Sequence, residues 1–363
     1  MTIRAGSPEI GEEEIRAAAE VLRSGFLVQA ARVREFERRV AAFVGVEHAV
    51  AVSSGTAALH LAVMALGLAP GDEVLVPDYT FPASANVVER AGAVPVLVDV
   101  RLDTYNVDVE ALERAVTPRT KAIMPVHLFG LSADMDPVLA LAQRRGLHVI
   151  EDAACALGAT YRGRQCGAMG DVGCFSFHPR KVITTGEGGM VTTNDAALAE
   201  RLASLRNHGQ AVQDGRVRFV DAGLNYRMTD IQGAIGVAQM DRIDGILARR
   251  AALAARYDAA LAGVRGVTRP SVPEGLRHVW QSYVVLLDDA VDRGALQARL
   301  RDGGIETTIG TYAVSAQPHY AGPGRPLPNA WRAQEHGLSL PMHTRLTDED
   351  VDRVAGALRE ALA

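Results

Sequence analysis

The sequence is nearly devoid of lysine. Of its 38 basic residues only Lys121 and Lys181 are lysines, and the rest are arginines. A guanidinium stays protonated and forms no Schiff base, whereas a lysine amine can lose its proton and act as a nucleophile or base. Lys121 precedes an apolar run and is expected to be an ordinary surface residue. Lys181 is therefore the candidate for lysine chemistry.

Other shortages exclude whole classes of protein. The three cysteines, Cys155, Cys166 and Cys174, show no Cys-x-x-Cys spacing, which argues against a disulfide framework and against a zinc site. No run of about 18 apolar residues is present, so no membrane span is expected. The net charge is −5 and no Lys/Arg run exceeds two residues, which disfavours a nucleic-acid partner. The N-terminus has no apolar leader, so a cytoplasmic protein is expected.

The composition and length indicate a globular chain of two domains. It has 363 residues, of which 48% are apolar and 22% are charged. From about 46 to 195, short β-branched runs alternate with helical stretches, which predicts a mostly parallel α/β sheet with helices on both faces. Strands are expected at 48–53, 73–77, 94–99, 122–126, 148–152 and 172–177. We predict a large domain over 1–245 and a small α+β domain over 246–363.

The C-terminal third has a different pattern. It predicts a long helix over 229–262, a strand at 281–287, a helix from 291, a short strand near 305, a loop over 310–330 and a terminal helix. Thr347 is the expected N-cap of that last helix, with Asp350 at the capping-box position. A further helix, at about 11–25, is expected to pack on the small domain.

Three features could carry chemistry. The segment Ser53–Ala58 closes a strand and opens a helix, where Gly55 would allow a phosphate to approach; simple N-capping is the alternative. Asp152 ends an apolar strand, where it either needs a cationic or donor partner or caps a following helix. Lys181 precedes a cluster of three glycines that permits close approach to a ligand.

Together these features match the requirements of pyridoxal 5′-phosphate (PLP). Its aldehyde condenses with a lysine, its phosphate needs a dipolar cradle, and a carboxylate keeps its ring nitrogen protonated. No Gly-x-Gly-x-x-Gly after the first strand, P-loop, His-Glu-x-x-His or Gly-x-Ser-x-Gly motif competes. Asp134 and Asp136 could suggest a metal, but Asp136 as an N-cap before Pro137 is the simpler interpretation, and no metal is predicted.

Several longer stretches resemble one known family. They are Ser53-Ser-Gly-Thr-Ala-Ala-Leu, Asp78-Tyr-Thr-Phe-Pro-Ala-Ser-Ala-Asn, Pro125-Val-His-Leu-Phe-Gly, Glu151-Asp-Ala-Ala, Gly170-Asp-Val-Gly-Cys-Phe-Ser-Phe-His-Pro-Arg-Lys, Gly186-Glu-Gly-Gly and Leu224-Asn-Tyr-Arg-Met-Thr-Asp. The chain resembles the nucleotide-sugar aminotransferases, the DegT family of fold-type I PLP-dependent enzymes, along nearly its whole length. The resemblance implies a fold-type I PLP-dependent transferase with PLP as its cofactor.

The resemblance also assigns roles to residues. It makes Lys181 the Schiff-base lysine and Asp152 the partner of the pyridine nitrogen. Gly55, Thr56 and Ser176 would hold the phosphate. Phe81 would stack on the ring, and Asn225 would reach the phosphate of the neighbouring subunit, which implies a homodimer with shared active sites. Spacing alone favours a core aromatic for Phe81 and a residue leading into a helix for Asn225.

The implied reaction moves an amino group from an amino acid, expected to be L-glutamate, to a keto sugar, expected to be a nucleoside-diphosphate 4-keto or 3-keto deoxyhexose. A keto-cyclitol acceptor and a non-catalytic PLP-binding regulator are the alternatives. Three departures from the family pattern concern the substrate side. They are Cys155 in place of Gln or His, the turn at 27–31, and the loop at 310–319.

Overall fold

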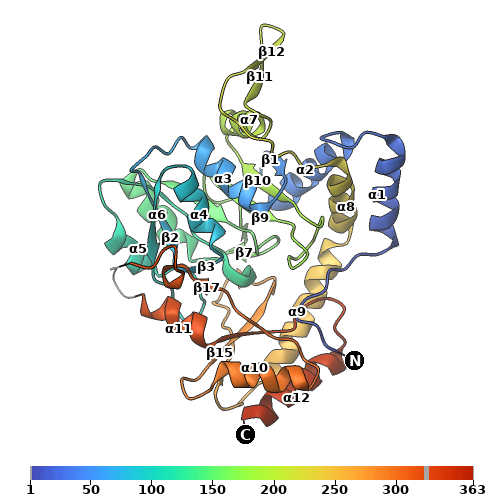
Figure 1. Cartoon of the computed structure of the whole chain (residues 1–363), viewed down its shortest axis with the longest axis vertical. Helices are drawn as coiled ribbons and strands as arrows, with labels where there is room; N and C mark the ends of the chain where they lie inside the picture. The colour runs from blue at the N-terminus through green and yellow to red at the C-terminus, as the bar shows by residue number, and fades with distance from the viewer. Residues whose placement is uncertain (1, 323–326, 363) are drawn as a thin grey trace.

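The larger part of the chain is built on a seven-stranded sheet. The computed structural model describes residues 2–322 and 327–362 (Figure 1). In spatial order the strands are β1 (His48–Val52), β10 (Gly189–Thr193), β9 (Val172–Ser176), β6 (His148–Asp152), β5 (Thr120–Ile123), β2 (Glu73–Pro77) and β4 (Val94–Val98). Of these seven, β10 runs antiparallel to both neighbours and the other six share one direction. The predicted mostly parallel sheet is confirmed.

Helices cover both faces of this sheet. One face packs against α3 (Gly55–Ala65), α4 (Ala83–Arg90) and α7 (Ala196–Leu205). The other face packs against α2 (Ala31–Val44), α5 (Val109–Ala115), α6 (Met135–Arg145) and α8 (Asp230–Asp241). Val50 and Val52 belong to the first core and Ala51 to the second, as the alternation along a strand requires. None of the helices in the described ranges is long and apolar enough to cross a membrane.

The C-terminal part is a smaller α+β structure, as predicted (Figure 1). Its antiparallel sheet contains, in spatial order, β13 (Val267–Thr268), β15 (Tyr283–Leu287), β18 (Gly337–Leu340) and β16 (Thr308–Ile309). It packs against α9 (Ile243–Ala260), α10 (Arg293–Asp302) and α12 (Asp348–Leu362). The helix expected over 229–262 is two helices, α8 and α9, with Arg242 between them. The proposed domain boundary near 245 lies at the start of α9.

The N-terminal helix packs on a different part of the molecule from the one expected. Helix α1 (Glu12–Ser24) lies along α8, where Glu14 Oε1 accepts a hydrogen bond of 2.7 Å from Gln239 Nε2. The residues before α1 reach the C-terminal part instead, because Ile3 forms a parallel bridge with Ile305. The burial of Glu14 among polar partners explains the difference, since these partners lie on α8 and at the start of α9.

Two local expectations need correction. Part of the loop expected at 310–330 is ordered: β17 (Tyr312–Ala313) pairs with β3 (Tyr79–Thr80), and α11 (Pro328–His336) begins at a proline, which suits the first helical position. Residues 323–326 of that expected loop lie outside the described residues. The N-cap of α6 is Asp134 and not Asp136. The capping box of Thr347 and Asp350 is confirmed by two backbone-to-side-chain bonds of 3.0 and 3.1 Å.

Candidate active site

The carboxyl ends of three strands meet at one edge of the large sheet. Val52 is paired with Gly189, and Gly189 is paired with Ser176, so the ends of β1 and β9 lie on either side of the start of β10. Asp152 is paired with Cys174 on β9. In open α/β sheets, ligands bind at this edge. The structure therefore gathers the sequence-predicted residues of three separate segments in one place.

A helix N-terminus and a hydroxyl form the first component of the site. Ser54 caps α3, and its Oγ accepts a 3.1 Å bond from the amide of Ala57. The capping interpretation is thus correct for Ser54. It leaves the phosphate interpretation open, because the amides of Gly55 and Thr56 are in the first turn, where helices lack intrahelical acceptors. A Cβ on Gly55 would lie 2.7 Å from Cβ of Ser176. Gly55 thus brings the helix start against the Ser176 side chain.

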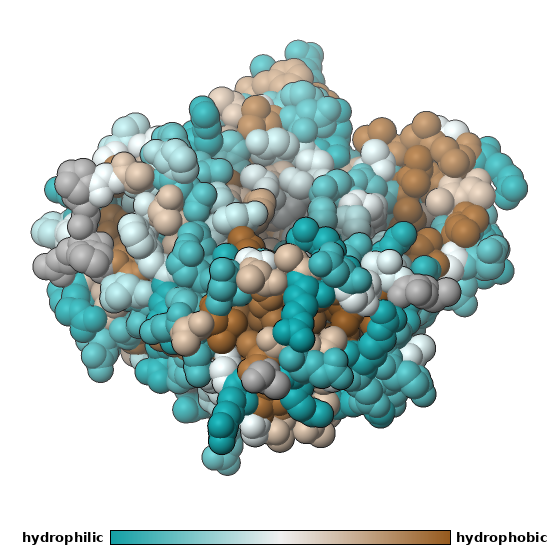
Figure 2. All heavy atoms as spheres, turned by 60° about the horizontal axis from the view of Figure 1, so that its bottom comes forward, coloured by the Kyte–Doolittle hydropathy of each residue, from teal (hydrophilic) through white to brown (hydrophobic). Residues whose placement is uncertain are grey.

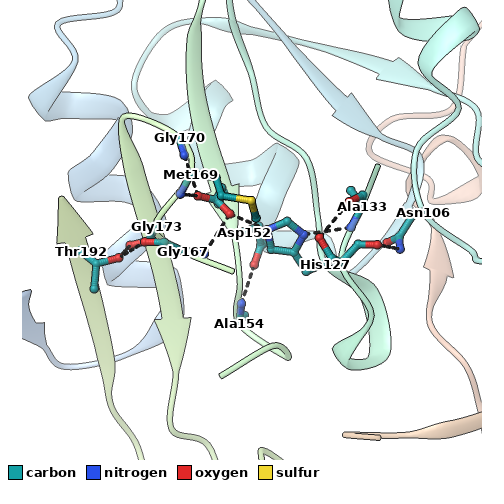
Figure 3. Close-up of polar contacts among 12 residues, drawn as sticks. Asn106, His127, Ala133, Asp152, Ala154, Gly167, Met169, Gly170, Gly173 and Thr192 are labelled. Carbon is teal, nitrogen blue, oxygen red and sulfur yellow. Dashed lines mark hydrogen bonds and ion pairs between the residues drawn. The ribbon is translucent and has the colours of Figure 1, made fainter. Parts of the chain in front are cut away.

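The second component is a carboxylate at the end of β6. Asp152 is 4% exposed. Its Oδ2 accepts a 2.7 Å bond from Ser84 Oγ. Its Oδ1 accepts a 3.1 Å bond from the amide of Ala154 (Figure 3). No α-helix begins directly after Asp152, so the helix-capping alternative is wrong. Asp152 forms no ion pair with an Arg, Lys or His in the described part of the chain, which suits a carboxylate that awaits a cationic ligand group.

Glu151, the preceding residue, points to the opposite face and has a different role. Its buried carboxylate accepts bonds from His127 Nε2 at 2.9 Å and from the amides of Gly167, Met169 and Gly170 at 2.6 to 2.8 Å (Figure 3). Burial opposes ionisation, but these donors together lower the pKa of Glu151 below its ordinary value. Sequence reasoning missed this network, although adjacent acids in an apolar strand were a signal that two different faces are involved.

The third component is the lysine. Lys181 is half-buried, and its Nζ donates a 3.1 Å hydrogen bond to Sγ of Cys155, three residues beyond Asp152. The segment that carries it is closed by a 2.8 Å bond from the amide of Phe177 to the carbonyl of Gly188. The amine and the carboxylate are thus brought to the same edge of the sheet. Lys121, in β5, is exposed.

Two predicted residues lie at this edge without touching the others. Phe81 is 63% exposed and makes an edge contact with Tyr312 at 6.5 Å between ring centroids, so the core-aromatic alternative is wrong. Asn225 is exposed, and the next residue, Tyr226, accepts a 2.9 Å bond from the amide of Ser53. Asn225 therefore lies beside the end of β1, with its side chain facing outward.

The residues present fit PLP. Gly55 lets the start of α3 lie directly against Ser176, so that the first amides of the helix and the Ser176 hydroxyl are neighbours, and a buried carboxylate and a half-buried amine stand at the same edge. The fold and these groups define a fold-type I PLP-dependent enzyme. The chain belongs to the DegT/DnrJ/EryC1/StrS aminotransferase family, whose model matches residues 8–359. The predicted aminotransferase class is thereby confirmed.

Individual relatives agree with this assignment. The chain is 48% identical over 332 residues to the GDP-perosamine synthase of Caulobacter vibrioides, which covers 90% of this chain and 89% of that protein. It is 41% identical to S. venezuelae DesV, solved in complex with a ketimine intermediate, with a TM-score of 0.90 over 96% of this chain and 94% of that one. Spr1654 of Streptococcus pneumoniae, solved in PLP and PMP forms, is 31% identical with TM-scores of 0.94 and 0.95 over 99% of this chain and 98% of that one.

Proposed function

We propose that this chain is a PLP-dependent aminotransferase that moves an amino group from L-glutamate to a keto sugar carried by a nucleoside diphosphate. The observation that carries the proposal is the placement of Lys181 and Asp152 at one edge of the sheet. The Lys181 amine is hydrogen-bonded to Cys155, and Asp152 lies three residues before that cysteine in the chain. When bound, PLP supplies an electron sink that stabilises negative charge on the substrate carbon.

Lys181 has two roles in this proposal. Its amine would hold the cofactor covalently while no substrate is present. Once free, Lys181 Nζ would act as the general base that takes the proton from the substrate carbon and as the acid that gives a proton up again. Among the described residues no carboxylate forms an ion pair with Lys181, so no such pair must break before the amine reacts.

The other predicted residues would bind and orient the cofactor. Asp152, held by Ser84 and Ala154, would keep the ring nitrogen protonated. The amides of Gly55 and Thr56, with the Ser176 hydroxyl, would hold the phosphate at the positive end of α3. The exposed ring of Phe81 would cover one face of the cofactor.

One relative supports a nucleotide-linked keto sugar as the class of acceptor. A GDP-perosamine synthase is 48% identical over most of both chains, and this favours a nucleotide-linked keto sugar over a keto-cyclitol. We keep the 4-keto and 3-keto deoxyhexoses as the acceptor class. The departures at 27–31 and 310–319 lie on segments of this chain that could change the sugar without changing the cofactor site.

A homodimer with shared active sites is also proposed. The hairpin of β11 (Gln210–Gln213) and β12 (Arg216–Phe219) projects from the molecule just before Asn225 (Figure 1). It exposes Val212 by 74%, Val217 by 63% and Phe219 by 68%. An exposed apolar hairpin beside an outward-facing asparagine supports a partner subunit that buries the first and receives the second.

Apolar side chains also gather on the side of the molecule that carries α1 (Figure 2). Ile15 is 55% exposed and Phe26, just after α1, is 73% exposed. This second surface supports the same proposal of a larger assembly.

The test compares the two lysines. Lys181→Ala should retain the fold but form no visible absorbance band of lysine-bound PLP, and it should not aminate any keto sugar with L-glutamate. Lys121→Ala, the matched control, should behave as the unmodified protein. A panel of nucleotide-linked keto sugars and keto-cyclitols would identify the acceptor. Persistence of the band in Lys181→Ala would refute the assignment, and inertness of the PLP-loaded protein toward the whole panel would favour the regulator.

A further inference from the structure

A small polar cavity lies beside the segment that carries Lys181. It is bounded by the N-terminal residues 5–7, by Pro179 and Arg180, and by the ends of β15 and β18. Its volume is about 10 Å³, which is room for about one water-sized group. Besides three serines, its polar lining side chains are Arg180, Arg250, Gln281 and His343.

Arg250, on α9, is a buried cation in the wall of this cavity. It is 5% exposed, and its Nη1 donates to the carbonyls of Trp280 at 2.9 Å and Gln281 at 3.3 Å. Its Nε has no partner, and among the described residues no carboxylate forms an ion pair with it. Burial lowers the pKa of Arg250 to about 10, against the weaker effect of Glu9. A buried charge normally has a counter-ion, because leaving it unpaired costs free energy.

The remaining wall does not supply that counter-ion. None of the described residues that line the cavity is an aspartate or a glutamate, and Arg180 adds a second guanidinium. Glu9 forms an ion pair with Arg242 and not with Arg250. Nε2 of His343 lies 3.2 Å from the carbonyl of Arg4, which places the ring hydrogen on Nε2 and leaves Nδ1 without one. The charged donors in the lining are therefore those of the two arginines, and the hydroxyls of Ser7 and Ser339 lie in the same lining.

We propose that this cavity is a subsite for a small anion. The anion is either a carboxylate group of the amino donor or an inorganic anion that places one atom in the cavity, such as chloride or one oxygen of nitrate. The limited volume admits one carboxylate oxygen, with the rest of the donor outside. The position suits the amino donor, because the cavity lies beside the lysine segment. Arg250 Nη2 lies 3.5 Å from the carbonyl oxygen of Lys181, and Gln281 Nε2 donates a 2.8 Å hydrogen bond to the carbonyl oxygen of Arg180. Only the carboxylate source rests on the proposed function; the anion site itself does not.

Intrinsic fluorescence can test the subsite without catalysis. The chain has two tryptophans, Trp280 and Trp331, and only Trp280 has its carbonyl on Arg250. The protein would be loaded with PLP and would carry Trp331→Phe, so that Trp280 is its one tryptophan. Nitrate and glutarate would be titrated in separate experiments. Each would replace a bulky sulfonate buffer anion, so that the ionic strength stays constant. Glutarate has the carboxylates of glutamate but no amine, so it cannot react. We expect a saturable change in Trp280 emission.

Variants connect this change to the cavity. Arg250→Lys keeps the charge but removes Nε, and Arg180→Gln alters an exposed side chain without affecting the core. Each should raise the apparent Kd at least tenfold. Arg249→Lys is the matched control on the same helix, where Arg249 pairs with Asp348, and it should leave the Kd unchanged.

The outcomes separate the sources. Saturation by glutarate that nitrate displaces supports the subsite and assigns it to the donor carboxylate. Saturation by nitrate alone supports the subsite and assigns it to an inorganic ion. Absence of saturation with both probes, or the same Kd in Arg180→Gln and Arg250→Lys as in the control, overturns the proposal. Because no turnover is measured, none of these results depends on whether a sugar is aminated.

Discussion

At the scale of single residues, neighbouring acids with the same chemistry have different surroundings. Asp152 has one hydroxyl and one amide as partners and no cation, whereas Glu151 has four donors. The carboxylate that still lacks a positive partner faces the proposed cofactor, and the satisfied one holds the loop at 167–170. Counting the partners of each buried acid therefore separates a binding residue from a structural one.

The first residue-scale prediction concerns Asp152→Asn. The amide can keep a bond to Ser84 but carries no charge to hold a proton on the ring nitrogen. We expect kcat to fall by about 10²–10³, the usual effect of removing one preorganised electrostatic group, with thermal stability nearly unchanged. Steady-state rates with L-glutamate would measure it. Asp136→Asn, which changes a partly exposed acid paired with two arginines, is the control; equal rates for both variants would contradict the assigned role.

The second prediction concerns Glu151 and pH. In Glu151→Gln, an amide group would face the amides of Gly167 and Gly170, and unsatisfied donors should destabilise the fold by about 3 kcal/mol. Because the pKa of Glu151 is lowered on folding, its contribution is complete above the unfolded-state pKa of about 4.3 and is lost as the pH falls through the lower folded value.

Urea unfolding of both proteins between pH 3 and pH 8 would measure this. The stability difference should be constant above about pH 5 and should shrink at lower pH. A difference that grows on acidification would show that the sign is wrong and that Glu151 is protonated in the native state.

At the scale of elements, the start of α3 is the most constrained part of the site. Gly55 packs directly against the side chain of Ser176. On the other side, a Cβ on Gly189 would lie 2.3 Å from the carbonyl oxygen of Ser54. The glycines after Lys181 were interpreted from the sequence as making room for a ligand. In the structure Gly189 instead lets strand β10 pass directly beside the helix start.

The element-scale prediction is that Gly55→Ala weakens PLP binding. Its Cβ would lie 2.7 Å from the Ser176 side chain, so the helix start and the hydroxyl must move apart. We expect the Kd of PLP to rise at least tenfold, about 1.4 kcal/mol, by spectroscopic titration. Gly356→Ala in α12 has no atom within 4 Å of the new Cβ and should stabilise the fold by up to about 1 kcal/mol. Unchanged PLP affinity in Gly55→Ala would contradict the phosphate site.

Most of the sheet could be predicted because its buried strands are continuous apolar runs. Strand β10 was missed because Gly-Met-Val-Thr-Thr has neither a long apolar run nor alternation, and its burial on both sides comes from β1 and β9. Strand β17 was missed for the same reason, since Tyr312 pairs with a distant residue, Thr80. Segments whose structure depends on distant partners leave little local pattern.

The same distinction applies to the site. Lys181, Asp152 and Gly55 stand in recognisable local motifs, so the sequence was sufficient to select them. The contact of Lys181 with Cys155 and the bond of Asp152 with Ser84 join separate segments and required the structure. The role proposed for Asn225 requires a second subunit, so it stays a prediction.

At the scale of the whole molecule, the proposal of shared active sites makes a distinctive prediction. Lys181→Ala and Asn225→Ala should each be defective alone, the first inactive and the second with weakened PLP binding. Mixed subunits would contain one site with both residues intact and one site with neither. Unfolding and refolding the two variants together should therefore restore activity, to at most about half per mixed dimer if the sites act independently.

Activity measured before and after subunit exchange, with sedimentation to establish the dimer, would check this. Refolding each variant separately is the control. If mixing restores nothing although mixed dimers form, Asn225 acts within its own subunit, and its position beside Ser53 in the same chain would then be the relevant one.

The scarcity of lysine has a practical consequence for handling the protein. Besides the terminal amine, the chain offers one exposed primary amine, Lys121 on β5, and one half-buried amine, Lys181. Ester-activated dyes or resins should therefore couple at Lys121 and at the terminal amine, which is the less protonated of the two near neutral pH, and a bound cofactor would shield Lys181. Immobilisation would then use very few attachment points on a solid support, a property that lysine-rich enzymes do not offer.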